Sequence, residues 1–596
     1  MSASHERSTL APSLSDHARR LRGAPVPRGG HPLPDSARTP RPRGTGPRLG
    51  EARARVADVL RSLLDAPGTD PEAALVATGI RDRAVLRAAA TFDHPDEEAV
   101  RALGRRLVRT GTTLVGVAAG IGLLSVLGEP QDVPYLRDLG MFDGLESAAV
   151  EALAPLDPQA AATVGLAHRA RETGLRALAD ALVSGLAGDL RALVVGVSAE
   201  SHRDVGPDQA RWIAEATRLP ALLRAHPGDR ELFAQAVLLL TRMTSRRDYA
   251  IALLRYGEAR ELYEAITARV AGEAPATGLD RQARLLSLAL DLHSGASRLL
   301  DWPPGRREEA LGTLLAAVGE PTEPDAKADA HPRTRRRAAW IRSTASRLRA
   351  VTASADPPPA PLPARAEPGP VSRLRIEVAV ADPGDLDAVE TRFLVDGRPL
   401  VPWAFGPGPG DVPERTLDTG ALRAGDEPRE VRLAEAYCSE GCCGALYVTV
   451  RREGPYVVWG DWSRPGAPRG LPDLPVLRFD ADAYDTEVAR AEQDRGWSWP
   501  ARDTARLIAR GLRERPELLA RWGLRLGWTG TDFGDPDATV ITYDDLPPAA
   551  GGAQDVQPRQ YLWLLPDDGA PPERRAAAAL RRFAEEDPRR YPESAG

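Results

Sequence analysis

A proline-rich segment at residues 351–370 separates two parts of the chain that have different hydrophobic patterns. Before it, apolar residues recur at helical spacing, whereas after it short runs alternate apolar and polar residues, as strands do. Proline favours extended backbone and lacks an N–H group, so such a segment is typical of a semi-rigid linker. The sequence therefore predicts a multidomain protein: all-α before the linker and α+β after it, with a largely antiparallel, sandwich-like sheet.

The predicted organisation has five parts. A length of 596 residues is enough for about two to four domains, each with its own core. We expect a disordered basic arm at 1–50, a helical, repeat-like domain at 51–350, the linker at 351–370, a β-rich subdomain at 371–480 and an α+β subdomain at 481–596.

The first 50 residues predict disorder. They contain nine arginines against three acidic residues, and almost no large apolar residues. A segment of this kind buries too little surface to offset the entropy that ordering costs. Such an arm is either a solvated tail, which we favour, or a contact for nucleic acid or an acidic protein.

Residues 51–350 are predicted to form one helix after another. In one of these helices Leu232, Ala236 and Leu240 form an apolar stripe. The connections are short and polar, as at 128–130 and 226–229. Short helices joined by short turns are typical of an α-solenoid or an irregular helical bundle.

Two segments of the helical half share a pattern. Residues 124–136 read LSVLGEPQDVPYL, and residues 149–162 read AVEALAPLDPQAAA. The first resembles the turn of HEAT/armadillo-type repeats, in which an alanine-rich helix ends in Leu-Gly before an acidic-proline turn and Val-Pro-x-Leu; the second is a weaker echo. The resemblance implies an α-solenoid with a concave protein-binding surface, and it implies no catalytic chemistry.

The stretch 438–462, CSEGCCGALYVTVRREGPYVVWGDW, is the most specific part of the C-terminal half. Its apolar residues alternate from Leu446 onward, Glu-Gly-Pro at 453–455 interrupts the run, and the strand resumes at Tyr456, which predicts an antiparallel hairpin. Residues 438–499 resemble uncharacterised bacterial proteins that share a Cys-Cys-Gly-Ala-Leu-Tyr strand and a Trp-x-Trp-Pro element. That resemblance implies a domain with no known activity.

All three cysteines, Cys438, Cys442 and Cys443, lie in the loop before this hairpin. They are candidate zinc ligands, with an acid such as Glu440 or Asp461 as the fourth, although paired CxxC spacing and histidine are missing. Alternatively, oxidation joins Cys438 to one of the other two in a disulfide. We favour a third alternative, in which the cysteines pack as small apolar residues. We therefore assign no metal and no cofactor.

Charge and composition narrow the possible functions. The net charge of −6 creates no global field that favours nucleic acid or a membrane. Lys327 is the single lysine and lies in a polar, linker-like context, which argues against a P-loop or a Schiff base. The start of the chain lacks the apolar core of a signal peptide, so we expect a cytoplasmic protein. The uncharged run at 112–128 contains glycines and predicts a buried helix rather than a membrane span.

Residues 333–349, RTRRRAAWIRSTASRLR, predict a basic helix. This helix is either an anchor or nucleic-acid contact, or, as we favour, a terminal helix of the solenoid with a solvated basic face. The interaction candidates of the whole chain are Arg335, Arg336, Arg337, Trp340, Trp459 and Trp462.

The sequence shows no convincing catalytic motif. His331 is the last histidine, so the C-terminal half has no local Cys-His or Ser-His pair. Asp461 and Asp480 are candidates for a carboxylate pair, but enrichment of acids at a helix N-terminus explains the cluster after the hairpin as well. We assign no catalytic residue and favour a role other than catalysis.

The sequence therefore predicts an intracellular interaction or scaffold protein with protein partners. Two alternatives stay open: a hydrolase using carboxylates near Asp461 and Asp480, and a nucleic-acid-associated protein using the basic arm and helix 333–349. A hydrolase predicts a cleft lined by acids with raised pKa values. Nucleic-acid binding predicts steep salt dependence. A scaffold predicts a groove or an exposed aromatic patch.

Overall fold

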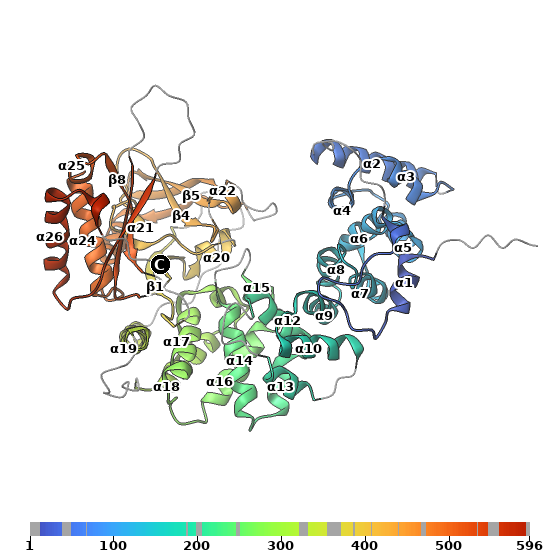
Figure 1. Cartoon of the computed structure of the whole chain (residues 1–596), viewed down its shortest axis with the longest axis horizontal. Helices are drawn as coiled ribbons and strands as arrows, with labels where there is room; N and C mark the ends of the chain where they lie inside the picture. Colours follow the sequence, from blue (N-terminus) through green and yellow to red (C-terminus); the bar gives the residue numbers. More distant parts are fainter. Residues whose placement is uncertain are drawn as a thin grey trace, which may run out of the picture. The chain divides into compact units, whose positions relative to one another are not determined.

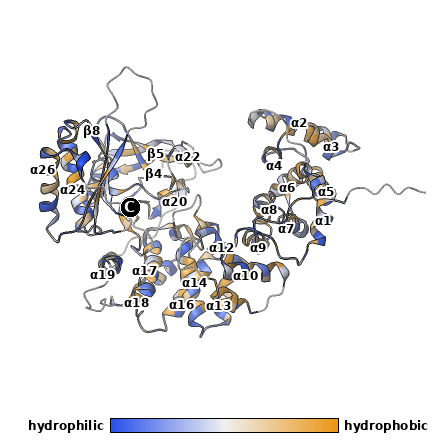
Figure 2. Ribbon diagram, viewed as in Figure 1, coloured by the Kyte–Doolittle hydropathy of each residue, from blue (hydrophilic) through white to orange (hydrophobic). Residues whose placement is uncertain are grey.

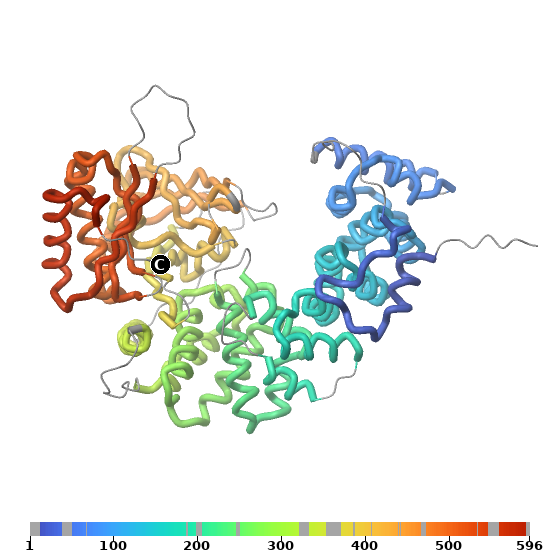
Figure 3. Tube along the Cα trace, in the orientation of Figure 1, coloured from blue at the N-terminus to red at the C-terminus, as the bar shows by residue number. Residues whose placement is uncertain are grey.

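A computed structural model shows two compact units, Met1–Met243 and Thr244–Gly596 (Figures 1 and 3). We call them the N-terminal unit and the C-terminal unit and describe each by itself. The structure describes residues 12–38, 49–66, 68–185, 189–197, 205–245, 251–320, 332–353, 371–384, 388–406, 408–438, 440–465, 473–532, 535–545 and 559–591.

The N-terminal unit is helical. Its elements are α1 (Leu14–Arg20), η1 (Asp35–Ala37), α2 (Leu49–Asp65), α3 (Pro71–Ala77), α4 (Asp82–Ala89), α5 (Glu97–Thr110), α6 (Leu114–Leu127), η2 (Pro130–Asp132), α7 (Val133–Leu139), α8 (Glu146–Leu153), α9 (Pro158–Arg169), α10 (Thr173–Ser184), α11 (Leu190–Val195), α12 (Pro207–Thr217), α13 (Leu219–Ala225) and α14 (Arg230–Met243). Figure 2 shows hydrophobic and hydrophilic residues mixed along these helices, as expected for helices that each bury one side. Residues 124–136 span the end of α6, η2 and α7, and their likeness to a HEAT turn stays a prediction.

Helix α6 lies at the centre of this unit. Every residue from Val115 to Leu124 is buried, and α4, α5 and α8 pack around it. Glycine permits the close approach: a Cβ on Gly122 would lie 2.6 Å from the backbone oxygen of Leu86 in α4. The prediction of a buried helix at 112–128 is therefore confirmed. Among the described residues, no helix combines the length and the apolar character that a membrane crossing requires.

The predicted disordered arm is wrong for residues 12–38, which we call the N-terminal strap. Leu14 of α1 is 1% exposed and belongs to the same core cluster as Phe142. Arg22 donates to the carboxylate of Asp138, 116 positions away, and Arg176 donates to the backbone oxygen of Val26. The strap has few apolar residues, but each of them packs against residues from distant parts of the chain. The composition of the strap alone does not reveal these packing partners. Residues 1–11 and 39–48 lie outside the described residues.

The C-terminal unit combines helices with strands. Its elements are α15 (Ala252–Arg255), α16 (Ala259–Val270), α17 (Leu279–Ser294), η3 (Ala296–Leu299), α18 (Arg306–Val318), α19 (Pro332–Ala353), β1 (Leu374–Val380), β2 (Val389–Val395), β3 (Arg398–Pro399), α20 (Leu400–Ala404), α21 (Pro413–Thr416), β4 (Arg429–Glu435), α22 (Glu440–Cys443), β5 (Ala445–Glu453), β6 (Tyr456–Ser463), β7 (Leu477–Asp480), α23 (Ala481–Gln493), α24 (Pro500–Glu514), α25 (Glu517–Ala520), β8 (Leu524–Thr531), β9 (Thr539–Asp545), β10 (Gln560–Leu565), α26 (Pro572–Glu585) and η4 (Pro588–Arg590).

The described strands form three antiparallel sheets, with strand orders β1-β2-β3, β4-β5-β6-β7 and β10-β9-β8. The predicted hairpin is β5–β6, and it turns at Gly454, whose φ of 57° is left-handed. Residues of α24, α26 and the third sheet share one core. A helical region followed by an α+β region with antiparallel sheets confirms the predicted fold class.

Trp459 is a central residue of the aromatic core between the first two sheets. Its side chain is 0% exposed. The rings of Phe393 from β2 and Phe479 from β7 pack nearly perpendicular to it, with ring centroids 5.9 and 5.4 Å away. Its indole N–H donates to the hydroxyl of Tyr484 in α23, which in turn donates to the backbone oxygen of Leu422. One residue of the predicted hairpin therefore joins two sheets and a helix.

The division between the units differs from the predicted domain boundary at 351–370. It falls at Met243, so helices α15 to α19 belong to the C-terminal unit. The reason is the free edge of strand β1. The indole N–H of Trp340 in α19 donates to the backbone oxygen of Val380, and Arg347 donates to that of Val378 (2.9 and 2.8 Å). Side chains thus satisfy edge groups that no strand pairs with. Residues 354–370 of the predicted linker lie outside the described residues.

Helix α23 uses the same edge. Glu487 accepts the N–H of Ile376 at 2.6 Å, and Arg490 donates to the backbone oxygen of Ile376. The helix therefore packs with the first two sheets, although the sequence assigned it to the subdomain at 481–596.

Candidate functional site: a cavity in the N-terminal unit

The N-terminal unit contains a cavity of about 570 Å³. The strap, α7, α9 and α10 form most of its wall. Figure 1 labels these three helices and α1, which is the helix of the strap. The lining residues are Ala18, Leu21, Arg22, Gly23, Ala24, Val26, His31, Arg137, Asp138, Met141, Phe142, Asp157, Gln159, Ala160, Thr163, Ala181, Leu182, Val183, Ser184, Gly185, Leu190 and Ala216. A second hollow of about 320 Å³ shares Gly23, Ala24, Ala181, Val183 and Ser184 with it. The two hollows share part of their wall along the strap and α10, and we call them together the recess.

Two arginines share one carboxylate at the rim of the cavity. Arg22 donates through Nε and Nη2 to Asp138, with an Nη2–Oδ2 distance of 2.5 Å. Nη2 of Arg137 lies 3.6 Å from the other oxygen of Asp138. The carboxylate is only 5% exposed, whereas the two guanidinium-bearing side chains are 52% and 46% exposed. The arginines are therefore accessible while Asp138 is not.

One histidine, His31, lines the cavity, and a second, His168, lies near it. His31 is 7% exposed and lines the cavity directly. Burial lowers the pKa of His31, and the imidazoles of His168 and His17 lower it further, so the ring is neutral at pH 7. His168 donates through Nε2 to the backbone oxygen of Gly140 at 2.7 Å. It packs so tightly on Gly30 that a Cβ there would lie 2.4 Å from the ring.

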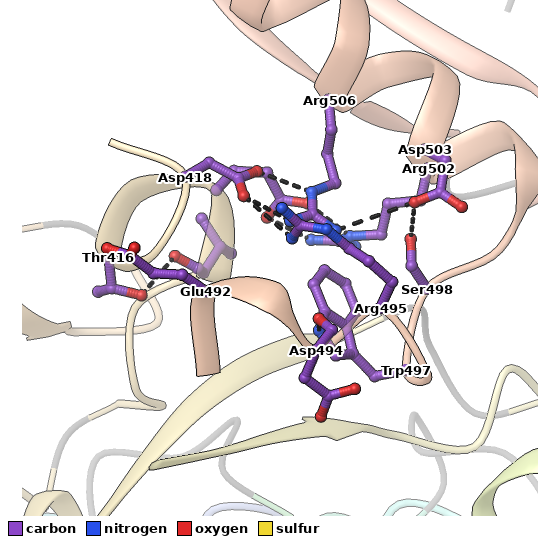
Figure 4. Close-up of polar contacts among 12 residues, drawn as sticks. Thr416, Asp418, Glu492, Asp494, Arg495, Trp497, Ser498, Arg502, Asp503 and Arg506 are labelled. Carbon is purple, nitrogen blue, oxygen red and sulfur yellow. Dashed lines mark hydrogen bonds and ion pairs between the residues drawn. The ribbon is translucent and has the colours of Figure 1, made fainter. Parts of the chain in front are cut away.

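A second conspicuous cluster lies in the C-terminal unit, where arginine and tryptophan side chains alternate. Arg506 lies over Trp497, Arg502 lies between Trp497 and Trp499, and Arg336 lies over Trp499, with distances from guanidinium carbon to ring centroid of 4.6, 5.6, 5.4 and 4.0 Å. We call these five residues the Arg-Trp ladder. Figure 4 shows Trp497 beside Arg502 and Arg506. Cation–π contacts of this kind are favourable when the cation is desolvated.

Carboxylates neutralise the ladder. Glu414 accepts two hydrogen bonds from Arg502 (2.7 and 2.8 Å). Asp418 accepts from Nε of Arg506 at 2.7 Å (Figure 4). Arg502 and Arg506 are 7% and 6% exposed, so the network is an interior one. It ties together α19, α21 with the residues that follow it, and the start of α24, which is a structural role.

Asp503 is the titratable group of this cluster with a shifted pKa. Burial raises the pKa of Asp503, and the hydroxyl of Ser498, which donates to it at 2.7 Å, opposes the rise. The nearby carboxylates of Glu573, Asp418 and Glu414 raise it as well. Ser498 precedes α24 and Asp503 lies in its first turn, so this hydrogen bond fixes the start of the helix.

The cysteine loop lies between β4 and β5. Cys438 is exposed and Cys443 is half-buried; the side chain of Cys442 lies outside the described residues. The ends of the loop are held by a hydrogen bond from Ala436 N to Gly444 O at 2.9 Å. The exposure of Cys438 argues against packing as a small apolar residue at that position. Within the described part of the chain, no three His, Cys, Asp or Glu side chains are grouped to hold a metal ion, and the zinc and disulfide alternatives stay predictions.

Most of the predicted interaction residues serve the interior instead. Trp340 and Trp459 are 1% and 0% exposed, so neither side chain is available to a partner. Arg336 belongs to the ladder, and Arg337 pairs with Asp382 at 2.6 Å. These four side chains are therefore engaged inside the unit and not as surface contacts. Trp340, Arg336 and Arg337 lie on α19, which packs on the edge of β1, and Trp459 lies on β6 between two sheets.

The other two interaction candidates are less deeply buried. Arg335 is exposed. Trp462 is half-buried, and its indole N–H donates to the backbone oxygen of Pro475 at 2.9 Å.

The carboxylates proposed for a hydrolase do not form a pair. Asp480 is the N-cap of α23 and lies opposite Tyr456, the first residue of β6. Asp461 is five residues further along that strand, a separation of roughly 16 Å at strand spacing. Its side chain is 72% exposed and pairs with Arg451. This arrangement is too open and too wide for a shared proton or a shared water.

Comparison with protein-family models, with curated proteins and with solved structures found no match to this chain. The two resemblances noted in the sequence therefore stay predictions.

Sequence reasoning did not identify the residues of the cavity. Arg22 and His31 lie in the predicted arm, and Asp138 lies in the helical region with no motif around it. No local signal joins them, since their contacts span more than a hundred positions. The Arg-Trp ladder was easier to predict from the sequence. The Trp-Ser-Trp at 497–499 precedes two arginines spaced i and i+4 on a helix, and this spacing places both arginines on one face.

Proposed function

We propose that this chain is a cytoplasmic interaction protein and that the cavity of its N-terminal unit binds a segment of a protein partner. The observation that carries the proposal is the cavity itself. Its volume of about 570 Å³ lies within the range of pockets that bind ligands. Its wall comes from separate stretches of the chain, which requires the folded unit.

The composition of the wall supports a binding role. Leu21, Met141, Leu182 and Val183 are only half-buried, so they leave apolar surface at the recess. Arginine side chains stand beside them at the rim. Apolar surface next to a few convergent polar groups is the usual pattern of a recognition site.

The alternatives have less support. A hydrolase needs carboxylates close together, and Asp461 and Asp480 are separated along β6 and β7. A nucleic-acid contact through 333–349 needs exposed arginines, whereas Arg336 and Arg337 have interior partners. Protein binding through the N-terminal unit requires neither arrangement.

The proposal is tested by site-specific photo-crosslinking of the full chain in the cells that make it naturally. A photoreactive phenylalanine analogue replaces Leu182 in the recess, and the control replaces Val126, which is 67% exposed on the same unit. We expect a discrete protein adduct from position 182 and none from position 126. The same adducts from both positions, or no adduct from position 182, would contradict the proposal.

A further inference from the structure

One corner of the cavity carries a net positive charge. Two guanidinium groups, from Arg22 and Arg137, face the single carboxylate of Asp138. Each guanidinium has five N–H donors, and Asp138 occupies only some of them. The two arginine side chains are half exposed, so a second anion at the rim has donors and one uncompensated charge to meet.

His31 supplies a second, independent indication of a ligand. Its side chain lines the cavity and is more than nine-tenths buried, at 7% exposure. Among the residues that the structure describes, no group forms a hydrogen bond with its ring, and only its backbone N–H and oxygen are engaged, with Met141 O and Asp143 N. Neither ring nitrogen is among the fully buried unpaired atoms of the described residues, so the nitrogens keep accessible surface where the ring lines the cavity. A polar group of a ligand in the cavity can therefore reach the ring.

The other acid of the lining does not cancel the charge at this corner. Asp157 is the N-cap of α9, and its Oδ1 accepts the N–H of Ala160 at 3.0 Å. Its negative charge therefore faces the positive end of the helix dipole. The hydroxyl of Thr163 and the amide of Gln159 are also engaged, with the backbone oxygens of Gln159 and Ala216.

From this geometry we propose that the cavity binds the C-terminal residue of a partner protein, with its carboxylate at Arg22 and Arg137 and its apolar side chain against Met141, Phe142 and Leu182. This proposal rests on the proposed function, because it takes the partner to be a protein. The further proposal specifies the chemistry of the bound group, which is a single carboxylate next to an apolar side chain.

The charge balance selects this group among anions. A phosphate dianion needs two uncompensated positive charges, and the corner provides one. An internal Asp or Glu carries a carboxylate but no apolar side chain of its own, and its flanking peptide groups would face the apolar wall unpaired. A C-terminal Leu, Ile, Val, Met or Phe places the carboxylate and the apolar side chain on the same Cα, which matches the adjacent charged and apolar walls.

The test is calorimetric titration of the full chain with N-acetylated tripeptides ending in Leu, Ile, Val, Met or Phe, each as the free acid and as the C-terminal amide. We expect at least one acid to bind about tenfold more tightly than its amide, since a charge-assisted hydrogen bond contributes that much. R137Q removes most of this preference. R87Q makes the same charge change on an exposed residue of α4 outside the cavity and retains the preference.

The outcomes separate the two proposals. If Ala181→Trp, which fills the recess, abolishes binding but acid and amide bind equally, the carboxylate inference fails and the proposed function stands. If 4-methylpentanoate binds with the same dependence on Arg137 and the peptides do not, the carboxylate chemistry holds and the protein partner is wrong. If no acid binds, or if neither R137Q nor A181W affects binding, the inference is overturned.

Discussion

The N-terminal unit and the C-terminal unit achieve close packing by different contacts. At the centre of the N-terminal unit, α6 has no charged residue and touches its neighbours through glycine and aliphatic side chains. In the C-terminal unit, buried arginines alternate with tryptophan rings in the Arg-Trp ladder, and carboxylates neutralise them. The first kind of contact is non-directional, whereas the second depends on orientation.

This difference changes what a gap costs in each kind of contact. Aliphatic contacts allow neighbouring helices to leave a cavity, at a cost in stability that grows with its volume. A buried guanidinium tolerates no such gap, because an unpaired buried charge costs several kcal/mol. Hollows of about 570 and 580 Å³ nevertheless occur in the N-terminal and the C-terminal unit, the second lined by Glu320 and residues of α19, so the kind of contact alone does not decide where space is left.

The largest expected effect tests whether helices and sheets of the C-terminal unit are one body. Trp340→Ala removes a side chain that is 1% exposed and leaves Val380 O without its partner, so we expect a loss of about 3–5 kcal/mol. Hydrogen exchange followed by mass spectrometry on the full chain is expected to show weaker protection in α17, α19 and β1 together, with no change in the N-terminal unit. The exposed Arg342→Ala on the same helix is the control. Loss of protection in α19 alone would separate the helices from the sheets.

The next effect tests the ladder. Arg502→Ala leaves the carboxylate of Glu414 buried without its bidentate partner, and we expect a loss of about 3 kcal/mol in the C-terminal unit. Denaturant unfolding of the full chain, monitored by tryptophan fluorescence, measures it. Arg510→Ala removes an exposed pair with Glu514 on the same helix and is expected to leave the midpoint unchanged. Equal midpoints for the two variants would show that the ladder is not stabilising.

A smaller effect tests the strap. Leu14→Ala removes a side chain that is 1% exposed in the core of the N-terminal unit, and we expect a loss of about 2–3 kcal/mol there. A disordered arm, as its composition predicts, would give no loss. Hydrogen exchange in α5 and α7, which contact α1, reports the effect, with the exposed Arg20→Ala as control.

The smallest effect uses pH to distinguish the units. Burial, followed by the charges of Arg298, Arg347, Arg392 and Arg375, lowers the pKa of His293 to about 3. A folded pKa below the unfolded value of about 6.5 means that its contribution to stability is complete above pH 6.5 and is lost as pH falls toward 3. Linkage predicts a loss of about 2 kcal/mol between pH 7 and pH 5.

His293→Gln is the variant that checks this prediction. It should flatten the pH dependence of the C-terminal unit over that interval, as measured by urea unfolding at each pH. The N-terminal unit, whose histidines are unchanged, provides the internal reference. An unchanged slope in the C-terminal unit would mean that His293 does not remain neutral there.

Several features of the fold follow from the sequence because they depend on near neighbours. The alternation from Leu446 onward and the glycine at 454 predict the β5–β6 hairpin, since a strand and its turn are set by adjacent residues. The uncharged run at 112–128 predicts a buried helix for the same reason, and the change of pattern around residue 370 predicts the fold class.

Contacts between distant residues decided everything else. The strap is ordered because Asp138, Phe142 and Arg176 meet it, and its own composition predicts disorder. The basic helix at 333–349 packs against the sheet because backbone oxygens at the free edge of β1 accept hydrogen bonds from its side chains. The cavity exists only because the strap, α7, α9 and α10 come together in the folded unit. Local sequence determines which helices and strands form. Which side chains remain available to a ligand is determined by burial and by hydrogen-bond pairing, and both depend on contacts with residues that are distant in the sequence.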